Sequence, residues 1–144
     1  MATALFIKRS DLVKNTIRNY LGSDLYNKIS ADVASGSLAG NYLALVNDYV
    51  QPMLIHFAMM DYLPFAAFSV TNGGVFKGNS ENAQTASKSE VDYLVNKERE
   101  FAEYYTRRFI DYMNYNSNLF PEYNTNSNDD IYPDHEATFN GWVL

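Results

Sequence analysis

Few side chains in this sequence have the types and spacing that chemistry requires. The chain contains two histidines and no cysteine, so thiolate metal sites and a cysteine nucleophile are excluded. His56 sits in a long apolar stretch with Asp61 five residues later, whereas partners on one helix face are three or four residues apart. A histidine–carboxylate pair would support acid–base catalysis. The spacing favours a hydrogen-bonded core or interface histidine, with a small enzyme using His56 as the alternative.

A cluster of acidic residues near the C-terminus is the second candidate. Its members are Asp129, Asp130, Asp134, His135 and Glu136. Carboxylate oxygens bind hard cations, but a calcium-binding loop needs acids at alternate positions and a central glycine, and Pro133 interrupts this run. We therefore interpret the cluster as a solvated acidic segment.

Two further patterns resemble nucleotide-binding features. Asn72-Gly73-Gly74 has too few glycines for a phosphate-binding loop and does not lead directly into a capped helix, so we predict a turn. A later, charged helix contains five tyrosines that would suit base stacking: Tyr93, Tyr104, Tyr105, Tyr112 and Tyr115. Acidic residues interleave with them, so we predict contacts between helices or subunits instead.

The sequence also lacks the short motifs of common enzyme classes. It contains no P-loop, no nucleophile elbow and no H-E-x-x-H motif. We therefore expect no catalytic residue, no cofactor and no metal site, and we predict that the protein is not an enzyme.

Composition indicates one domain with extensive aromatic contacts. The 144 residues are enough to bury a core without disulfides. Aromatic residues make up 15% of the chain, including 12 tyrosines, and tyrosine is favoured at protein interfaces. The N-terminal sequence lacks the order of basic and apolar residues found in signal peptides, so we predict an intracellular product.

The charge is placed unevenly along the chain. The net charge is −6. Residues 1–118 contain all 11 basic residues and 12 of the 17 acidic ones, whereas residues 119–144 contain five acids and no base. Affinity for nucleic acid depends on basic groups at phosphates, so a nearly neutral body with an acidic tail argues against that class of ligand.

The longest apolar run, Asn41 to Val70, predicts the central element of the fold. Helical spacing relates Leu43, Val46, Val50, Leu54, Phe57 and Met60, and further apolar residues widen the stripe to most of the circumference. Polar and charged residues interrupt the run, which favours a buried core helix over a transmembrane one. Asn41 is predicted as its N-cap, Pro52 as the site of a kink and Pro64 as its end.

The flanking segments predict three further helices and a hairpin. A first helix runs to Leu21 with Gly22 as C-cap, and Ser23 caps a second helix. Asn-Gly between β-prone flanks predicts a two-stranded β-hairpin tongue over residues 70–79. Ser87 and Glu90 form a capping box that begins a helix of roughly 27 residues.

The last stretch, residues 119–144, predicts an extended C-terminal arm. Asn, Asp and Pro disfavour regular structure there, yet large apolar residues are too frequent for a solvated tail. Such an arm orders only against a surface, either its own body or a neighbouring subunit. The predicted fold is therefore mainly α, a small helical bundle around a central buried helix, with a helical domain over residues 1–118 followed by the arm.

The order of these segments resembles the head–tail connector proteins, also called adaptor or ring proteins, of tailed bacteriophages, most closely those of crAss-like phages of Bacteroidetes. Three segments carry the likeness: YLGSDLYNKI (residues 20–29), NDYVQPMLIHFAMMDYLPF (residues 47–65) and NGGVF (residues 72–76). The likeness covers residues from about 5 to 118. It departs from the family where residues 12–17 run directly into residues 18–22, because relatives place an acidic helical segment between them.

The resemblance implies a structural virion protein without enzymatic activity. Such subunits form a ring, dodecameric by resemblance, beneath the portal protein in the virion neck. The ring extends the DNA channel and receives the next neck or tail ring protein. Its expected partners are further copies of itself, the portal, that next ring protein, and DNA passing through the lumen without sequence-specific binding. No membrane contact is expected, and the protein would be made in the host cytoplasm.

By the same analogy, the tongue and the arm contain the residues that contact neighbouring subunits and the portal. These predicted interface residues are Asn72, Gly73, Gly74, Val75, Phe76, Phe120, Tyr123, Tyr132, Phe139, Trp142 and Leu144. The alternative to a ring subunit is a small cytoplasmic helical module that binds a host protein, or, less favoured, the small enzyme that uses His56.

Overall fold

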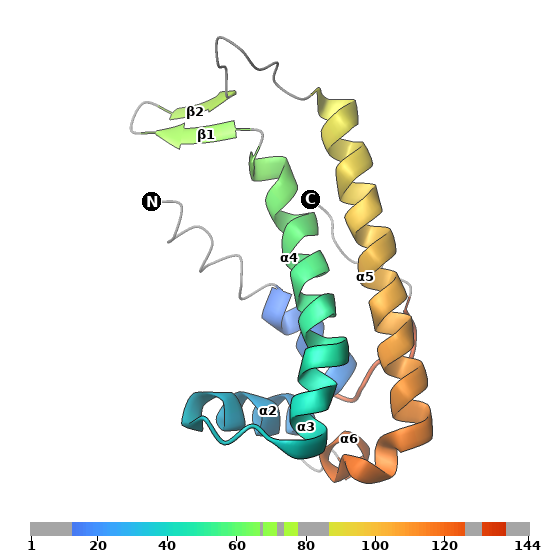
Figure 1. Ribbon diagram of the computed structural model, residues 1–144. Coiled ribbons are helices and arrows are strands. Elements are labelled where there is room, and N and C mark those ends of the chain that lie inside the picture. The colour runs from blue at the N-terminus through green and yellow to red at the C-terminus, as the bar shows by residue number, and fades with distance from the viewer. Residues whose placement is uncertain (1–12, 67, 72–73, 78–86, 126–130, 138–144) are drawn as a thin grey trace.

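The computed structural model describes residues 13–66, 68–71, 74–77, 87–125 and 131–137. Within these residues the chain is mainly helical, as predicted. Two long helices, α4 (Gln51–Ala66) and α5 (Lys88–Asn116), run antiparallel and side by side (Figure 1). The shorter helices α2 (Ser23–Ser35), α3 (Gly40–Leu45) and α6 (Pro121–Thr125) gather at one end of this pair.

The first described segment is a helix over residues 13–21, which is followed directly by α2. The helix passes without interruption through the place where the sequence departs from the connector family. Gly22 separates the two helices with φ +79°, a left-handed conformation that glycine adopts at no steric cost. The predicted cap at Ser23 is wrong, because Gly22 occupies the N-cap position and no side chain caps α2. Ser23 is instead the first residue of α2 and is buried.

The central element is one nearly continuous helical rod that consists of α3, the π-helical segment η1 (Val46–Val50) and α4. The N–H of Gln51 bonds to the carbonyl of Val46, five residues back, as in a π-turn. Pro52 follows immediately and lacks the N–H that an α-helix would direct to Asp48. The predicted disruption at Pro52 is therefore a local widening of the helix.

Two predictions about the ends of this rod are wrong. Asn41 is not the N-cap: α3 begins at Gly40, with Ala39 as the cap residue and no side-chain cap bond. Pro64 does not end the helix, because α4 continues to Ala66 with Pro64 inside its last turn. A proline restricts the residue before it without always stopping the helix.

The capping box predicted at the start of α5 is confirmed. The Ser87 side chain accepts a hydrogen bond from the Glu90 N–H at 3.2 Å, and the Glu90 carboxylate accepts one from the Ser87 N–H at 3.1 Å. Together they satisfy two backbone donors that the first turn would otherwise leave unpaired. The helix that follows has 29 residues, close to the predicted length.

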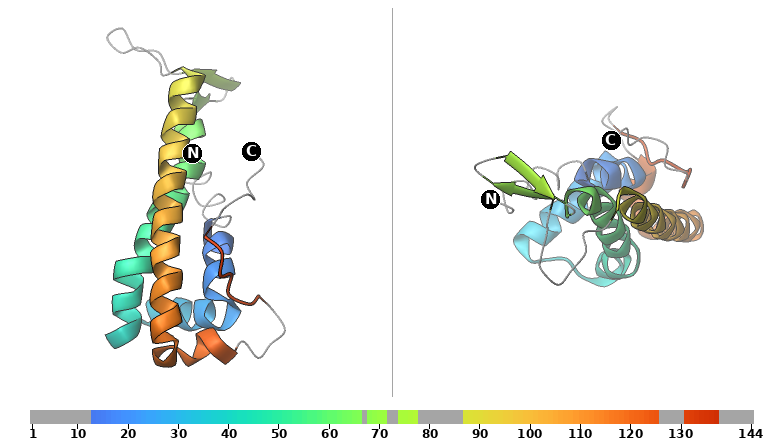
Figure 2. Two further views of the ribbon diagram at one scale, coloured as in Figure 1. Left: turned by 90° about the vertical axis from the view of Figure 1, so that its right-hand side faces the viewer. Right: turned by 90° about the horizontal axis from the view of Figure 1, so that it is seen from above.

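At the far end of α4, two short strands pair antiparallel. Strand β1 (Phe68–Thr71) lies against β2 (Gly74–Lys77), with Val70 opposite Val75. Asn72 and Gly73, the predicted turn, lie outside the described residues. Figure 2 shows the strands at the opposite end of the long helices from α2 and α6.

The core lies between the long helices, the helix over residues 13–21 and the short helices at one end. Its fully buried members include Leu21, Leu25, Leu45, Met53, Phe57, Met60, Phe109, Met113 and Phe120. Along the central rod the buried stripe is therefore not the one that regular helical spacing predicts. Leu43 and Leu54, both predicted to be buried, are 40% and 39% exposed.

The chain after α5 corrects the prediction of an arm that begins at residue 119. A 3₁₀ turn, η2 (Ser117–Leu119), leads into α6, and both pack on the end of the bundle. Phe120 is 0% exposed, with its ring edge-on to Tyr42 at 5.2 Å, and Tyr123 is also buried. Because Phe120 and Tyr123 belong to the core of their own chain, their assignment to an interface with other subunits is wrong.

Substitution of Phe120 tests this placement. Phe120→Ala leaves a cavity in the core, so the free energy of unfolding should fall by about 3–5 kcal/mol in urea unfolding. Leu119→Ala is the matched control, because the Leu119 side chain is 37% exposed. This substitution should lower the free energy of unfolding by less than about 1 kcal/mol. Equally small losses of unfolding free energy in both variants would mean that residues 119–120 do not pack on the helical core.

Candidate functional site

His56 is part of a contact between the two long helices. Its Nδ1 lies 2.6 Å from Oε2 of Glu98 on α5, and its ring stacks on Tyr105 at 5.3 Å. Phe101 contacts the ring from another side at 5.2 Å. Asp61, the partner considered from the sequence, is buried elsewhere on α4. His56 was predicted to be a hydrogen-bonded core or interface histidine. The hydrogen bond is confirmed, and the contact joins α4 to α5 within one chain.

The acidic cluster is only partly described. Asp134, His135 and Glu136 are exposed, whereas Asp129 and Asp130 lie outside the described residues. The Asp134 side chain accepts a hydrogen bond from the Glu136 N–H at 2.9 Å, and the His135 ring lies edge-on to Tyr123. Among the described residues, no group of three or more histidine or acidic side chains is arranged to hold a metal ion.

Residues 131–137 lie against the corner between the helix over residues 13–21 and α2, as Figures 1 and 2 both show. Ser23 makes two hydrogen bonds with Ile131: its N–H donates to the Ile131 carbonyl at 3.0 Å, and its hydroxyl accepts from the Ile131 N–H at 3.1 Å. The Asp134 N–H donates to the Asn19 carbonyl at 2.8 Å. This part of the C-terminal arm therefore binds its own chain.

Gly22 makes this docking possible. A Cβ atom at position 22 would lie 2.9 Å from both Cδ and Cγ of Pro133 and 3.2 Å from the Ile131 carbonyl oxygen. The segment YLGS (residues 20–23) thus has a structural role that its resemblance to the connector family did not indicate. Its glycine turns the chain and leaves room for Pro133, and its serine binds Ile131.

Burial in this region changes the acidity of three tyrosines. Desolvation, with the Asp134 carboxylate as the next cause, raises the pKa of Tyr20 and the pKa of Tyr123 to about 12 each. Desolvation and a 2.6 Å hydrogen bond from its hydroxyl to Glu122 raise the pKa of Tyr42 to about 12. These tyrosines keep their protons at neutral pH, so none of them supplies a phenolate for chemistry.

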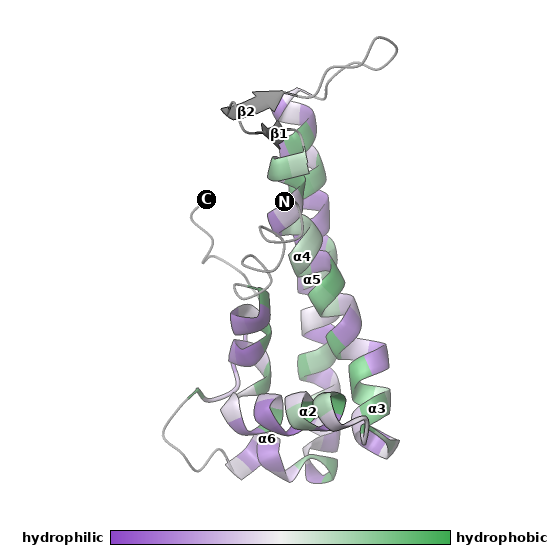
Figure 3. Cartoon of the chain, turned by 90° about the vertical axis from the view of Figure 1, so that its left-hand side faces the viewer, coloured by the Kyte–Doolittle hydropathy of each residue, from purple (hydrophilic) through white to green (hydrophobic). Residues whose placement is uncertain are grey.

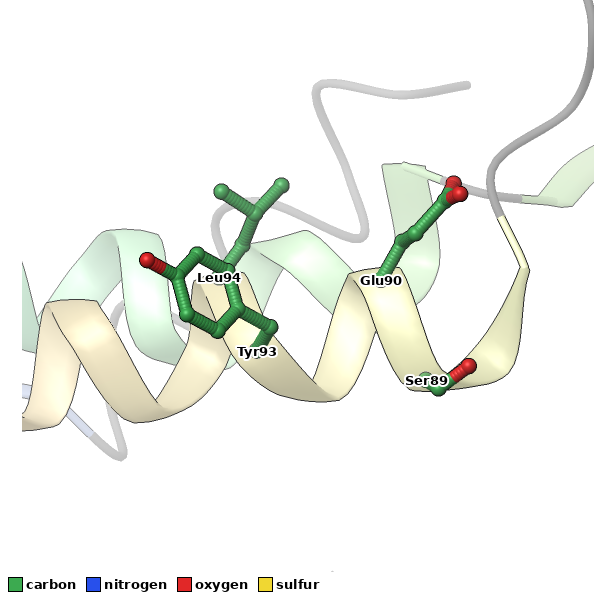
Figure 4. Close-up of a pocket in the computed structure, with 4 residues that line it drawn as sticks. All are labelled: Ser89, Glu90, Tyr93 and Leu94. Atoms are coloured by element: carbon green, nitrogen blue, oxygen red, sulfur yellow. The ribbon is translucent and has the colours of Figure 1, made fainter.

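A surface hollow on α5 offers no reactive group either. It is lined by Ser89, Glu90, Tyr93 and Leu94, all on adjacent turns near the start of the helix (Figure 4). Glu90 is already engaged in the capping box, and the Ser89 hydroxyl lies 3.2 Å from that of Ser87. The hollow is therefore an uneven part of a helix surface, with two apolar side chains at its centre.

The outward surface of α4 is the more informative feature. Five large apolar side chains are between 37% and 50% exposed: Leu54, Ile55, Met59, Tyr62 and Phe65. Ile55, Met59 and Tyr62 lie on the side of α4 opposite Met53, Phe57 and Met60, with Leu54 and Phe65 at the edge of that side. Figure 3 shows the upper half of α4 as largely hydrophobic. No charged side chain of α4 is exposed. We call these five residues the α4 face.

A second exposed stripe runs along α5. Tyr93, Leu94, Phe101 and Tyr104 are between 46% and 61% exposed, and we call them the α5 stripe. Tyr93 and Tyr104 each lie two residues before a buried residue, Val95 and Thr106, which places them on roughly the opposite side of the helix. Lys97 lies 5.7 Å from the Tyr93 ring and Arg108 lies 5.7 Å from the Tyr104 ring. Lys97 lies within the stripe, between Tyr93 and Phe101, and pairs with Glu100 at 3.2 Å, whereas Arg108 lies one turn beyond Tyr104.

The residues predicted to form interfaces lie in different environments in the structure. Phe120 and Tyr123 are in the core, and Tyr132 is 65% exposed on the docked segment. Gly74, Val75 and Phe76 form most of β2, but the structure describes only their backbone. Asn72, Gly73, Phe139, Trp142 and Leu144 lie outside the described residues. For all of these except Phe120 and Tyr123, a role in assembly stays a prediction.

The α4 face was missed although its signal is present in the sequence. A helix that is apolar nearly all round is either fully enclosed or has a second apolar side turned outward. We predicted the first case, and the structure has the second. Contiguous apolar patches of this kind, without exposed charge, are typical of surfaces that contact another protein.

The fold and these surfaces define a class: a small helical protein that presents two apolar helix faces and a docked C-terminal segment. The chain belongs to a family of unknown function, DUF6712, whose model matches residues 17–132. The matched region continues past residue 118 to include α6 and the start of the docked segment. Comparisons with curated proteins and with solved structures give no match. Among the described residues, no helix is both long enough and apolar enough to cross a membrane.

Replacement of Gly22 tests the docking of the C-terminal segment. Gly22→Ala combines a left-handed backbone with a clash against Pro133, whereas Gly36→Ala has a left-handed backbone, φ +72°, and nothing within 4 Å. The αL backbone of Gly36, with ψ 17°, costs alanine about 1–2 kcal/mol. Gly22 has ψ 160°, a combination with positive φ that is almost exclusive to glycine, so its backbone cost is larger. Gly22→Ala should lower the free energy of unfolding by about 1–3 kcal/mol more than Gly36→Ala does in urea unfolding.

Hydrogen exchange supplies the second measurement. In Gly22→Ala, but not in Gly36→Ala, the Ile131 and Asp134 amides should lose protection, because their acceptors no longer meet them. Equal losses of stability together with unchanged protection would contradict the docked arrangement.

Proposed function

We propose that this protein is a structural subunit of a homo-oligomeric ring in the head–tail connector of a tailed bacteriophage. The observation that carries the assembly part of the proposal is the pair of exposed apolar surfaces, the α4 face and the α5 stripe. A monomer gains nothing by exposing two such surfaces, whereas a subunit with neighbours on two sides buries both. The phage assignment rests on the resemblance of residues 20–29, 47–65 and 72–76.

The organisation of the chain suits a ring component. The long helices supply a stiff wall, and the short helices and β1–β2 lie at its two ends, where contacts with the portal above and the next ring protein below would form. An excess of acidic residues suits a channel in which DNA slides without sticking, since attraction to phosphates requires basic groups. In this proposal the β-hairpin is a contact tongue.

The alternative protein-binding module uses the same surfaces for a host protein. It differs in what it predicts: a stable complex with a protein of the host and no self-assembly. The enzyme alternative needs His56 to act in catalysis, yet its ring is packed between Phe101 and Tyr105 and bound to Glu98. That environment supports a role in joining helices.

The native mass of the full-length protein tests the ring proposal. Measured by analytical ultracentrifugation alone and with the portal ring of the same phage, the protein should form a closed assembly of many copies, alone at high concentration or on the portal. A portal ring from an unrelated phage serves as the control and should not bind. A monomer under every condition would contradict the proposal, and a complex with a host protein without self-assembly would favour the binding module.

A further inference from the structure

We infer that neighbouring copies of this chain join side by side, with the α4 face of one copy packed on the α5 stripe of the next. This inference rests on the proposed ring function and names the surfaces that would build it. The occupant of each face is therefore a second copy of the chain.

The first argument is that the two surfaces match in length and height. Each extends over about three turns of helix, or roughly 16 Å. The contacts within one chain fix their relative levels: His56 lies beside Phe101, and Tyr49 stacks on Tyr112 at 4.6 Å. Since α4 and α5 run antiparallel, Tyr62 is then near the level of Tyr93 and Leu94. Copies placed at equal height around an axis parallel to the helices would bring the two surfaces into register.

The second argument is that the surfaces are complementary in chemistry. The α4 face is uncharged, as the centre of an interface usually is, and offers aliphatic and thioether groups beside the rings of Tyr62 and Phe65. The α5 stripe offers mainly aromatic rings, whose faces pack well on such groups. Aromatic residues are also those that contribute most binding energy in protein interfaces.

The third argument comes from Asp48 and from Arg108, whose guanidinium donates a hydrogen bond to the Tyr104 hydroxyl at 3.4 Å. Asp48 is exposed just before the α4 face, and Arg108 is exposed just beyond the α5 stripe. The Arg108 guanidinium lies 6.0 Å from the Tyr49 ring, so Asp48 and Arg108 are at the same level of the bundle. Within the described part of the chain neither forms an ion pair. In the side-by-side arrangement, Asp48 of one copy and Arg108 of the next meet at the margin of the interface.

A contact between two unlike surfaces allows further copies to be added. The α4 face and the α5 stripe are different surfaces, so a pair of copies leaves one of each kind free for a further copy. An interface of this heterologous type closes into a ring when the rotation between neighbours divides a full turn. A half-exposed large side chain leaves about 100 Å², which gives roughly 400–500 Å² on each surface. Each contact is then at the low end of specific interfaces, so a pair of copies should associate weakly at high concentration, and ring closure or the portal adds further stability.

Two charge insertions and their mixture test the inference. Ile55→Glu disables the α4 face and keeps the α5 stripe, and Leu94→Glu does the opposite. Each variant alone should bind its neighbour about 100-fold or more weakly and remain monomeric where wild type assembles. Mixed in equal amounts at the high concentration where wild type assembles, they should form a dimer and nothing larger, because one intact face and one intact stripe remain. Mass by analytical ultracentrifugation gives the readout.

Val33→Glu is the matched control, because Val33 is 59% exposed on α2 and lies outside both surfaces. This variant should assemble like wild type. Circular dichroism checks that each variant is folded. If wild type assembles and the two variants assemble equally well, or if their mixture stays monomeric, the inference is overturned while the ring proposal stands. If wild type never assembles, with or without the portal, both fall.

Discussion

The missing N–H of Pro52 is the constraint on which the rest of the arrangement depends. It is accompanied by a π-turn over Val46–Val50, and a π-turn adds one residue to the helix, which rotates the preceding residues by about 100° relative to those that follow. This rotation aligns Leu45 with Met53 on the buried side and turns Leu43 outward. The buried sides of α3 and α4 are thereby aligned, and both contribute to one core.

The second organising contact is the corner at Gly22. One left-handed glycine turns the chain between two helices, and the space that its missing side chain leaves is filled by Pro133. Ser23 then pairs with Ile131 through two hydrogen bonds, so a segment more than 100 residues away is held at the start of the fold. The family match over residues 17–132 includes Gly22, Ser23 and Ile131 and ends one residue before Pro133. Docking is thus part of the fold and leaves the helical faces as the surfaces available for assembly.

Sequence predicted the elements whose signals are local. The capping box at Ser87 and Glu90 and the length of α5 depend on a few neighbouring residues, and the structure confirms both. Predictions that required tertiary information were wrong. Phe120 was predicted to lie in an arm, because the residues next to it in the sequence do not show that its ring packs against Tyr42. The apolar circumference of α4 was visible, but only the packing of α5 on one side shows that the other side is exposed. The pairing of His56 with Glu98 likewise joins residues on separate helices, which spacing along the chain does not show.

The central claim is that copies meet through unlike surfaces, and a cross-link tests it most directly. The chain contains no cysteine, so introduced cysteines react only with one another. Gln51 borders the α4 face and Tyr104 ends the α5 stripe. In an assembly of the double variant Gln51→Cys, Tyr104→Cys, mild oxidation should give a ladder of covalent multimers, whereas each single variant should stay monomeric under denaturing conditions. Dimers of either single variant, or an assembly of the double variant without a ladder, would contradict the account.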